Sequence, residues 1–138
     1  MVCAAGVALR VLVMVTYASA VFVFQNGDSI RYARIAAPGF HSALFSDPTA
    51  PAGYPALLKL LRAVWSALPF TIGVQHALGV VTALVLYALT RRLGASRGVA
   101  VIPAAVVLLS GDQLFLEHAL LTETVWGLLL SAGLYAML

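Results

Sequence analysis

The chain has 138 residues, of which 62% are hydrophobic and only 9% are charged. A soluble domain of this size normally has about a quarter of its residues charged, so this composition excludes an ordinary water-facing surface and predicts an integral membrane protein. The formal net charge of +3 is too small and too scattered to indicate a nucleic-acid partner.

The first expected element is an apolar helix over residues 2–24, which is long enough to cross about 30 Å of hydrocarbon. Arg10 interrupts this run, and we expect its side chain to snorkel towards the nearer membrane interface. A secretory signal peptide is the rival interpretation, because Ala18-Ser19-Ala20 is similar to a cleavage site. The run has no Lys or Arg before Arg10 and stays apolar past Ala20, which favours an uncleaved helix.

A long connection, residues 25–69, follows this helix. It begins with the polar segment QNGDSIRYARIA and then becomes rich in proline and glycine. Loops of this length are usually functional or disordered, and the aromatic residues in this one indicate packing. We expect a short helix over 29–36 with Asp28 as its N-cap. We expect stiff turns over 46–55, because each proline fixes its own φ.

A helical period begins after Pro55, with two different faces. The apolar face is formed by Leu57, Leu61, Val64, Trp65 and Leu68, and the polar face by Lys59, Arg62 and Ser66. At about 13 residues this helix is too short to cross a bilayer. An apolar face, a basic face and a tryptophan are typical of an interfacial helix that lies flat on the membrane.

Three further apolar runs predict membrane spans over residues 70–90, 98–111 and 124–138. Gln75 and His76 lie inside the first of them, where polar groups usually face the interior of the helix bundle. A second polar cluster, GDQLFLEHALLTET, covers residues 111–124. It follows Ser110, which together with Gln113 resembles a capping box, and it places His118 and Thr122 one helical turn apart.

The predicted fold is therefore an all-α, polytopic membrane bundle of about four transmembrane helices with one interfacial helix, all in a single membrane domain. The turn between the second and third spans contains Arg91, Arg92 and Arg97, and the positive-inside rule places it in the cytoplasm. The amino terminus is then cytoplasmic as well. Both polar clusters, 25–69 and 111–124, come together on the outer face of the plasma (inner) membrane.

The first polar cluster contains a candidate catalytic group. Asp28 is either a helix cap or a carboxylate base at the mouth of a membrane cavity, and the two roles are compatible. Arg31 and Tyr32 follow three and four residues later, so all three side chains can face one way. A base beside a cation that binds phosphate is a suitable arrangement for transferring a group from a phosphate carrier.

The other polar residues each have a structural and a functional interpretation. Arg34, Lys59 and Arg62 are typical of interfacial side chains near anionic headgroups, or one of them binds the phosphate of a lipid-linked substrate. His76 and His118 either bond between helices or line a substrate cavity. Glu123 is favourably placed for the dipole of the fourth span, or it takes part in the reaction.

A divalent metal ion has weak support. Glu117 and His118 are adjacent, so on a helix their side chains point about 100° apart. The HExxH spacing of metalloproteases does not occur in the chain. We therefore leave the cofactor open and assign no metal ligands.

Four segments resemble, in the same order, the amino-terminal part of the GT-C membrane glycosyltransferases, of the protein O-mannosyltransferase and aminoarabinose transferase type. The segments are GDSIRYARIA, AGYPALLKLL, VQHALGVVTALVLYALTRRLG and LFLEHALLTETVW. The resemblance implies transfer of a sugar from a polyprenyl-phosphate carrier to a glycan, lipid or protein acceptor on the outer face. The family's first-loop catalytic acid corresponds to Asp28, and its acid near the fourth span to Glu123. Many members have a second acid after the first, where this chain has Ser29.

The candidate substrate-binding residues are Arg31, Tyr32, Arg34, Tyr54, Lys59, Arg62, His76 and His118. The partners that the resemblance implies are the lipid-linked donor, the acceptor and membrane lipids. Two alternatives remain: a small, non-enzymatic, GtrA-like four-helix protein that handles polyprenyl-phosphate lipids, and an inactive fragment. The sequence stops inside the fourth expected span, so we expect it to be a piece of a longer protein. The 45 residues between the first two spans favour the enzyme over the small bundle.

Overall fold

The computed structural model describes residues 1–17, 27–36 and 52–138. Every regular element in these ranges is a helix, which confirms the all-α prediction. The helices are α1 (Val2–Thr16), α2 (Gly27–Ile35), α4 (Gly53–Val64), α5 (Leu68–Arg92), α6 (Arg97–Leu109), α7 (Gly111–His118) and α8 (Glu123–Met137).

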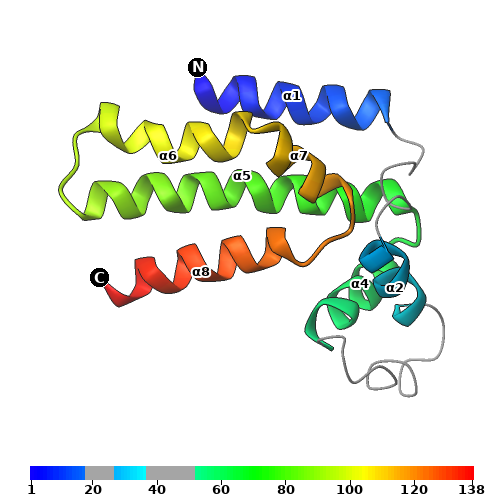
Figure 1. Cartoon of the computed structure of the whole chain (residues 1–138). Coiled ribbons are helices and arrows are strands. Elements are labelled where there is room, and N and C mark those ends of the chain that lie inside the picture. Colours follow the sequence, from blue (N-terminus) through cyan, green and yellow to red (C-terminus); the bar gives the residue numbers. More distant parts are fainter. Residues whose placement is uncertain (18–26, 37–51) are drawn as a thin grey trace.

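Helix α5 is the centre of the fold, and α1, α6 and α8 lie alongside it (Figure 1). Helices α1 and α6 run in one direction, and α5 and α8 run in the other. Helices α2 and α4 lie at the end of the bundle where α5 begins. The arginine-rich turn between α5 and α6 lies at the opposite end, with both chain termini. The two predicted polar clusters therefore share one end of the molecule in the described parts of the chain.

One helix of the described residues is long and apolar enough to cross a membrane. Helix α5 has 25 residues and a mean hydropathy of 1.8 over its most apolar window, and it covers the span predicted at 70–90. Helices α6 and α7 meet the same criteria only when they are taken together as one span bent by 51°. Helices α1 and α8 have 15 residues each. Residues 18–24 of the first predicted span lie outside the described residues.

The third predicted span, 98–111, ends earlier than expected. Helix α6 stops at Leu109, and Ser110 has an extended backbone with ψ 128°. The Ser110 hydroxyl accepts a hydrogen bond from the Gln113 backbone N–H at 3.4 Å, which confirms the predicted cap of the next helix. The chain bends here because this cap starts the new helix α7. That helix ends at His118, so the prediction that His118 and Thr122 share a helical face is wrong.

Helix α4 begins two residues before Pro55, because a proline in the first turn of a helix loses no hydrogen bond. The prediction of turns is therefore wrong for residues 53–55, and residues 46–51 lie outside the described residues. The face of α4 that packs inwards carries Tyr54 and Leu58. Val64 belongs to the predicted apolar face, but it is exposed, as lipid contact would require.

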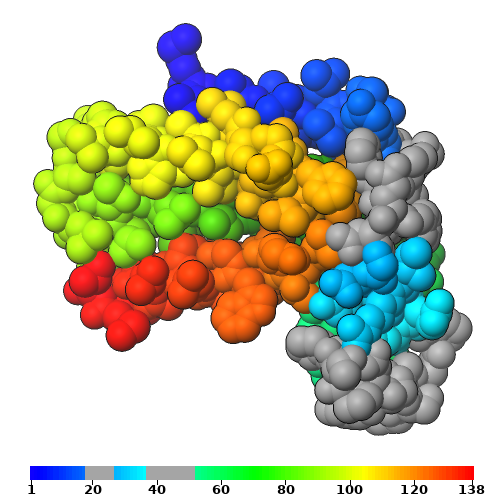
Figure 2. Space-filling model, in the orientation of Figure 1, coloured from blue at the N-terminus to red at the C-terminus, as the bar shows by residue number. Residues whose placement is uncertain are grey.

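The outer surface of the bundle is strongly apolar. Large hydrophobic side chains are exposed along α1, α6 and α8, among them Val11, Leu12, Val15, Ile102, Val106, Trp126, Leu129 and Leu130. Figure 2 shows a face of the molecule on which these three helices are visible. A water-soluble monomer rarely exposes continuous apolar surface of this kind, whereas a helix that faces lipid does.

Candidate functional site

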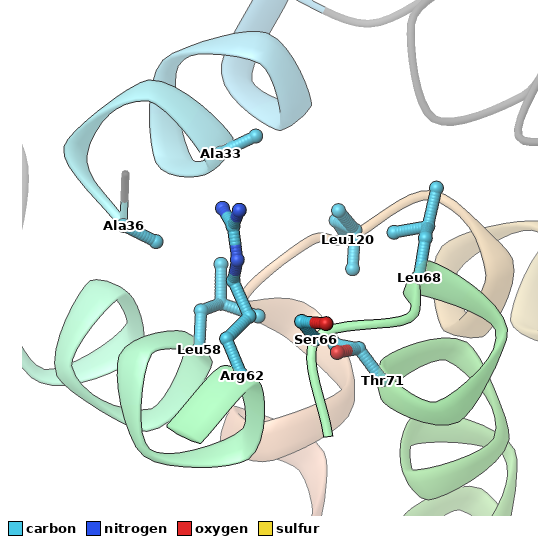
Figure 3. A pocket seen from close by; sticks show the side chains of 8 residues that line it. All are labelled: Ala33, Ala36, Leu58, Arg62, Ser66, Leu68, Thr71 and Leu120. Atoms are coloured by element: carbon cyan, nitrogen blue, oxygen red, sulfur yellow. The ribbon is translucent and has the colours of Figure 1, made fainter. Parts of the chain in front are cut away.

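A cavity of about 200 Å³ lies where α2 and α4 meet the start of α5. It is lined by Ala33, Ala36, Leu58, Arg62, Ser66, Leu68, Thr71 and Leu120. In Figure 3 the Arg62 side chain extends into the space between α2 and the segment that carries Leu120, with Ser66 and Thr71 near its base. The cavity therefore combines apolar walls with one guanidinium group and two hydroxyl groups.

The local sequence explains this arrangement. Helix α4 ends at Val64, and α5 begins only four residues later, at Leu68. Arg62 is therefore in the last turn of α4, close to the first turn of α5, which contains Thr71. The amino-terminal end of a helix carries partial positive charge. Together with the Arg62 guanidinium, it favours an anionic group in this cavity.

Asp28 and its neighbours are on α2, at the same end of the molecule. Asp28 is exposed in the first turn of this helix, so it lies inside the helix rather than before it. The neighbouring Ser29 is buried and donates a hydrogen bond to the Ala119 carbonyl. This contact joins the start of α2 to the segment between α7 and α8. Of the predicted substrate-binding residues on α2, Arg31 is half-buried and Arg34 is exposed.

Tyr32 and Tyr54 are part of the core that joins α2 to α4. Their rings meet edge to face, with centroids 5.1 Å apart and an interplanar angle of 80°. The Tyr54 hydroxyl donates to the Gln75 side-chain oxygen at 2.6 Å. Burial, with a smaller contribution from Glu123, raises the pKa of Tyr54 above its ordinary value. Tyr54 is therefore a neutral hydrogen-bond donor.

Glu123, the second predicted catalytic acid, is exposed at the first position of α8. The Thr122 hydroxyl donates to its carboxylate at 3.3 Å. Helix α8 begins at Glu123, five residues after the end of α7, and the Ser29 contact places the start of α2 near α7. Asp28 and Glu123 thus lie on separate helices that converge on the same end of the bundle.

The two cations predicted on the polar face of α4 have different environments. Lys59 is buried, with 8% of its surface exposed, so the expectation of an interfacial, snorkelling side chain is wrong for it. The helix is rotated so that Tyr54, Leu58 and Lys59 face inwards. Arg62 is exposed to the cavity, and it is the cation of α4 that a ligand can reach there.

The most extensive polar network of the described residues surrounds Glu117, whose side chain is fully buried. Arg10 of α1 donates to its carboxylate at 2.6 Å, and to the main-chain oxygens of Leu108 at 2.9 Å and Gly6 at 3.1 Å. Arg10 is 3% exposed, so the prediction that it snorkels to the interface is wrong. The reason is that α7 supplies a buried counter-charge, which makes the interior position favourable.

The two predicted histidines belong to this same network. His76 Nδ1 lies 2.8 Å from the Glu117 carboxylate, and His76 Nε2 lies 3.3 Å from His118 Nδ1. His118 Nε2 lies 3.1 Å from the main-chain oxygen of Tyr17. His76, as predicted, faces the bundle interior together with Gln75. Both histidines bond between helices, and His118 also lines a second cavity.

Two further side chains fix the position of Glu117. Gln113 donates to its carboxylate at 3.1 Å, and Gln75 donates to its main-chain oxygen at 2.8 Å. The carboxylate lies directly against Gly79 of α5, where a Cβ atom would overlap with it. Glycine at position 79 therefore permits the close approach of the carboxylate to α5.

The sequence did contain a signal for this network. Arg10 is the only charged residue before Asp28, and ionisable groups inside a membrane bundle usually pair with each other. A buried partner for Arg10 could have been sought among the few acids of the chain. Which acid it is depends on the bend between α6 and α7, which the sequence did not predict.

Among the described residues, no three His, Cys, Asp or Glu side chains are grouped as metal ligands would be. Comparison of the chain with protein-family models, with curated proteins and with solved structures finds no match. Inference about function therefore rests on the geometry of the cavity and of the buried network.

Proposed function

We propose that this chain is a multi-pass membrane protein that transfers a glycosyl group. The donor is a polyprenyl-phosphate-linked sugar, and the acceptor is a glycan, lipid or protein on the extracytoplasmic face of the plasma membrane. The observation that carries the proposal is the cavity beside Arg62. Its apolar walls suit a hydrocarbon chain, and its guanidinium and hydroxyl groups suit a phosphate.

The apolar outer surface supports a membrane location for the whole bundle. Helix α5 crosses the bilayer. Three further crossings, formed by α1, by α6 with α7, and by α8, surround it, so the bundle has about four crossings in all. The apolar side chains on the outside of α1, α6 and α8 then contact lipid. The arginine-rich turn and the amino terminus face the cytoplasm, and α2 and α4 lie at the outer face.

In the proposed reaction Arg62 binds the phosphate of the donor, and the sugar projects towards the end of the bundle that carries Asp28 and Glu123. The acceptor hydroxyl oxygen attacks the anomeric carbon of the sugar. Its proton passes to the Asp28 carboxylate as the bond between the anomeric carbon and the phosphate oxygen breaks. Polyprenyl phosphate leaves with the electron pair of that bond, and Arg62 stabilises its charge.

Binding of the lipid phosphate is tested with farnesyl phosphate and farnesol on the full chain in detergent micelles. We expect farnesyl phosphate to bind, and the Arg62→Met variant to bind it about 10- to 100-fold more weakly, because a hydrogen bond to a charged group is worth about 1.5–3 kcal/mol. Arg97→Met is the matched control, since Arg97 is exposed at the start of α6. Equal affinities of the Arg62 variant, the control and the wild type would reject the site.

Catalysis is tested separately, by the release of polyprenyl phosphate from a polyprenyl-phosphate-linked hexose in membranes that contain the chain. Asp28→Asn should lose this release and keep the binding of farnesyl phosphate. Asp112→Asn is the control, because Asp112 is also exposed in the first turn of a helix. Binding without release in the wild type would favour the small, non-enzymatic lipid-handling protein. Unchanged release in Asp28→Asn would reject Asp28 as the base.

A further inference from the structure

The pair formed by His76 and His118 has an unusual set of neighbours. The two rings come from α5 and α7, with centroids 5.5 Å apart. Each ring has one nitrogen directed at the other ring and one nitrogen directed at an oxygen atom. The outer nitrogen of His76 faces the Glu117 carboxylate at 2.8 Å, and the outer nitrogen of His118 faces the Tyr17 carbonyl at 3.1 Å.

Both outer nitrogens must carry a hydrogen atom. A main-chain carbonyl oxygen accepts hydrogen bonds and cannot donate one, so His118 Nε2 is an N–H group. The Glu117 carboxylate also accepts, as it does from Arg10 at 2.6 Å and from Gln113 at 3.1 Å. His76 Nδ1 is therefore an N–H group as well.

The two inner nitrogens, 3.3 Å apart, require one more hydrogen between them. Without it, two lone pairs would face each other in a buried site, which is a costly contact. A neutral imidazole carries one N–H group, so two neutral rings supply only two hydrogens. If all three contacts are hydrogen bonds, three hydrogens are needed, which is one proton more than two neutral histidines carry.

The surroundings of the pair contain terms of both signs. Both rings are buried, which disfavours an extra positive charge. Helix α1 ends at Thr16 and α7 ends at His118, so the partial negative charge of two helix ends lies near the His118 ring and favours this charge. Among the described residues, the charged side chains of the same network are Glu117 of α7 and Arg10 of α1, which have opposite charges. On the side of α4, Gln75 connects the network to the neutral Tyr54, which lies near Glu123 of α8. Helix α6 contributes main-chain oxygens, which Arg10 binds.

We propose that His76 and His118 form a proton-binding site, in which one imidazole and one imidazolium share a single proton between their inner nitrogens. His118 also lines a cavity of about 230 Å³ between α1 and α7, together with Val13, Tyr17, Gly111, Leu114 and Phe115. The proposal does not depend on glycosyl transfer.

Loss of the shared proton has a defined structural consequence. With only two hydrogens, the pair must give up one of its three hydrogen bonds. The negative charge of the Glu117 carboxylate holds its bond to His76. If the bond between the two rings is also kept, the bond between His118 and the Tyr17 carbonyl is the one that is lost. That bond joins the end of α7 to the end of α1. The site therefore makes this contact between the two helices dependent on pH.

The test is nitrogen NMR of the histidine rings in the full chain, labelled with ¹⁵N-histidine and placed in lipid nanodiscs. His41 is the third histidine of the chain, and His41→Gln leaves only this pair to observe. Spectra are recorded between about pH 5 and about pH 9, a range that brackets ordinary imidazole titration. This titration changes no residue of the pair, so it does not depend on a variant that fails to fold; His118→Asn is used only for the coupling measurement.

At the lower pH we expect three of the four ring nitrogens to carry hydrogen. As the pH rises, the pair should lose one proton in total, and the signals of both rings should change in the same step. The Nε2 signal of His118 should change to that of an acceptor in the same step. In His118→Asn, the His76 ring should titrate at a pH that differs by about one unit or more, because its coupling partner is gone. Two rings that stay neutral over the whole range would overturn the proposal. Two separate and independent steps, unchanged by the His118 substitution, would also overturn it.

Discussion

Replacement of Arg10 by methionine removes the cation of the buried network and keeps a side chain of similar length. In the wild type, the guanidinium joins α1 to both α6 and α7, through the Leu108 carbonyl at 2.9 Å and the Glu117 carboxylate at 2.6 Å. The variant leaves the Glu117 carboxylate, which is fully buried, without its strongest counter-charge. We therefore expect α1 to lose its main polar attachment to the bundle.

The expected loss of stability is about 3–5 kcal/mol, the usual cost of removing one member of a buried ion pair. For a chain of this size, that corresponds to a fall in Tm of roughly 10–20 °C. Glu117→Gln removes the charge of the partner at nearly constant volume. Because each single variant leaves the other charge unpaired, the double variant should be more stable than the sum of the two single losses predicts, by about 1–3 kcal/mol.

Thermal unfolding of the full chain in detergent micelles, followed by circular dichroism, measures these differences. Arg97→Met is the control, because Arg97 is exposed at the start of α6 and the same substitution there should change Tm little. The reasoning is refuted if Arg10→Met is as stable as this control. It is also refuted if the losses of the two single variants simply add.

Three other predictions concern the packing of Gly79, the burial of Tyr54 and the topology of the chain. Gly79→Ala should lower the free energy of unfolding by about 1–3 kcal/mol, because the new methyl group overlaps with the buried carboxylate. Its control Gly127→Ala, where the added Cβ has open space, should raise Tm slightly. Equal effects of the two substitutions on Tm would contradict the packing of Gly79 against the carboxylate. Burial raises the pKa of Tyr54 in the folded chain, so as the pH rises the unfolded chain loses this proton at a lower pH than the folded chain. The free energy of unfolding of the wild type should therefore fall above about pH 10, and it should fall by more than that of Tyr54→Phe. Single cysteines at Ala63 and Ser96, in a cysteine-free background, should react with a membrane-impermeant thiol reagent from opposite sides, and labelling from the same side would overturn the proposed topology.

Local sequence patterns predicted the helices where one short-range rule decided the outcome. The long apolar run of α5, the serine cap at Ser110 and the start of α8 at Glu123 all agree with the structure. The helix predicted at 29–36 is present as α2. In each case the helix follows from the length of an apolar run or from a hydrogen bond within one helical turn. Both can be recognised from residues that are close together in the sequence.

The errors concern partners that are distant in the sequence. Arg10 and Glu117 are 107 residues apart, and no local rule could tell that a bend after Leu109 brings the carboxylate against α1. The expected snorkelling of Arg10 was the correct inference for an isolated helix. It failed because a buried counter-charge and three main-chain oxygens compensate for the loss of water around the guanidinium.

Helix α4 illustrates how packing selects between two similar residues. Lys59 and Arg62 were both predicted on its polar face, three positions apart, and sequence alone could not separate them. Tyr54 and Leu58 determine the rotation of the helix, because their side chains fill the core between α2 and α5. Lys59 follows Leu58 on the inner side and is buried, whereas Arg62 reaches the edge of that core and lines the cavity. The same hydrophobic contacts that hold α4 in place therefore determine which of its cations lines the cavity.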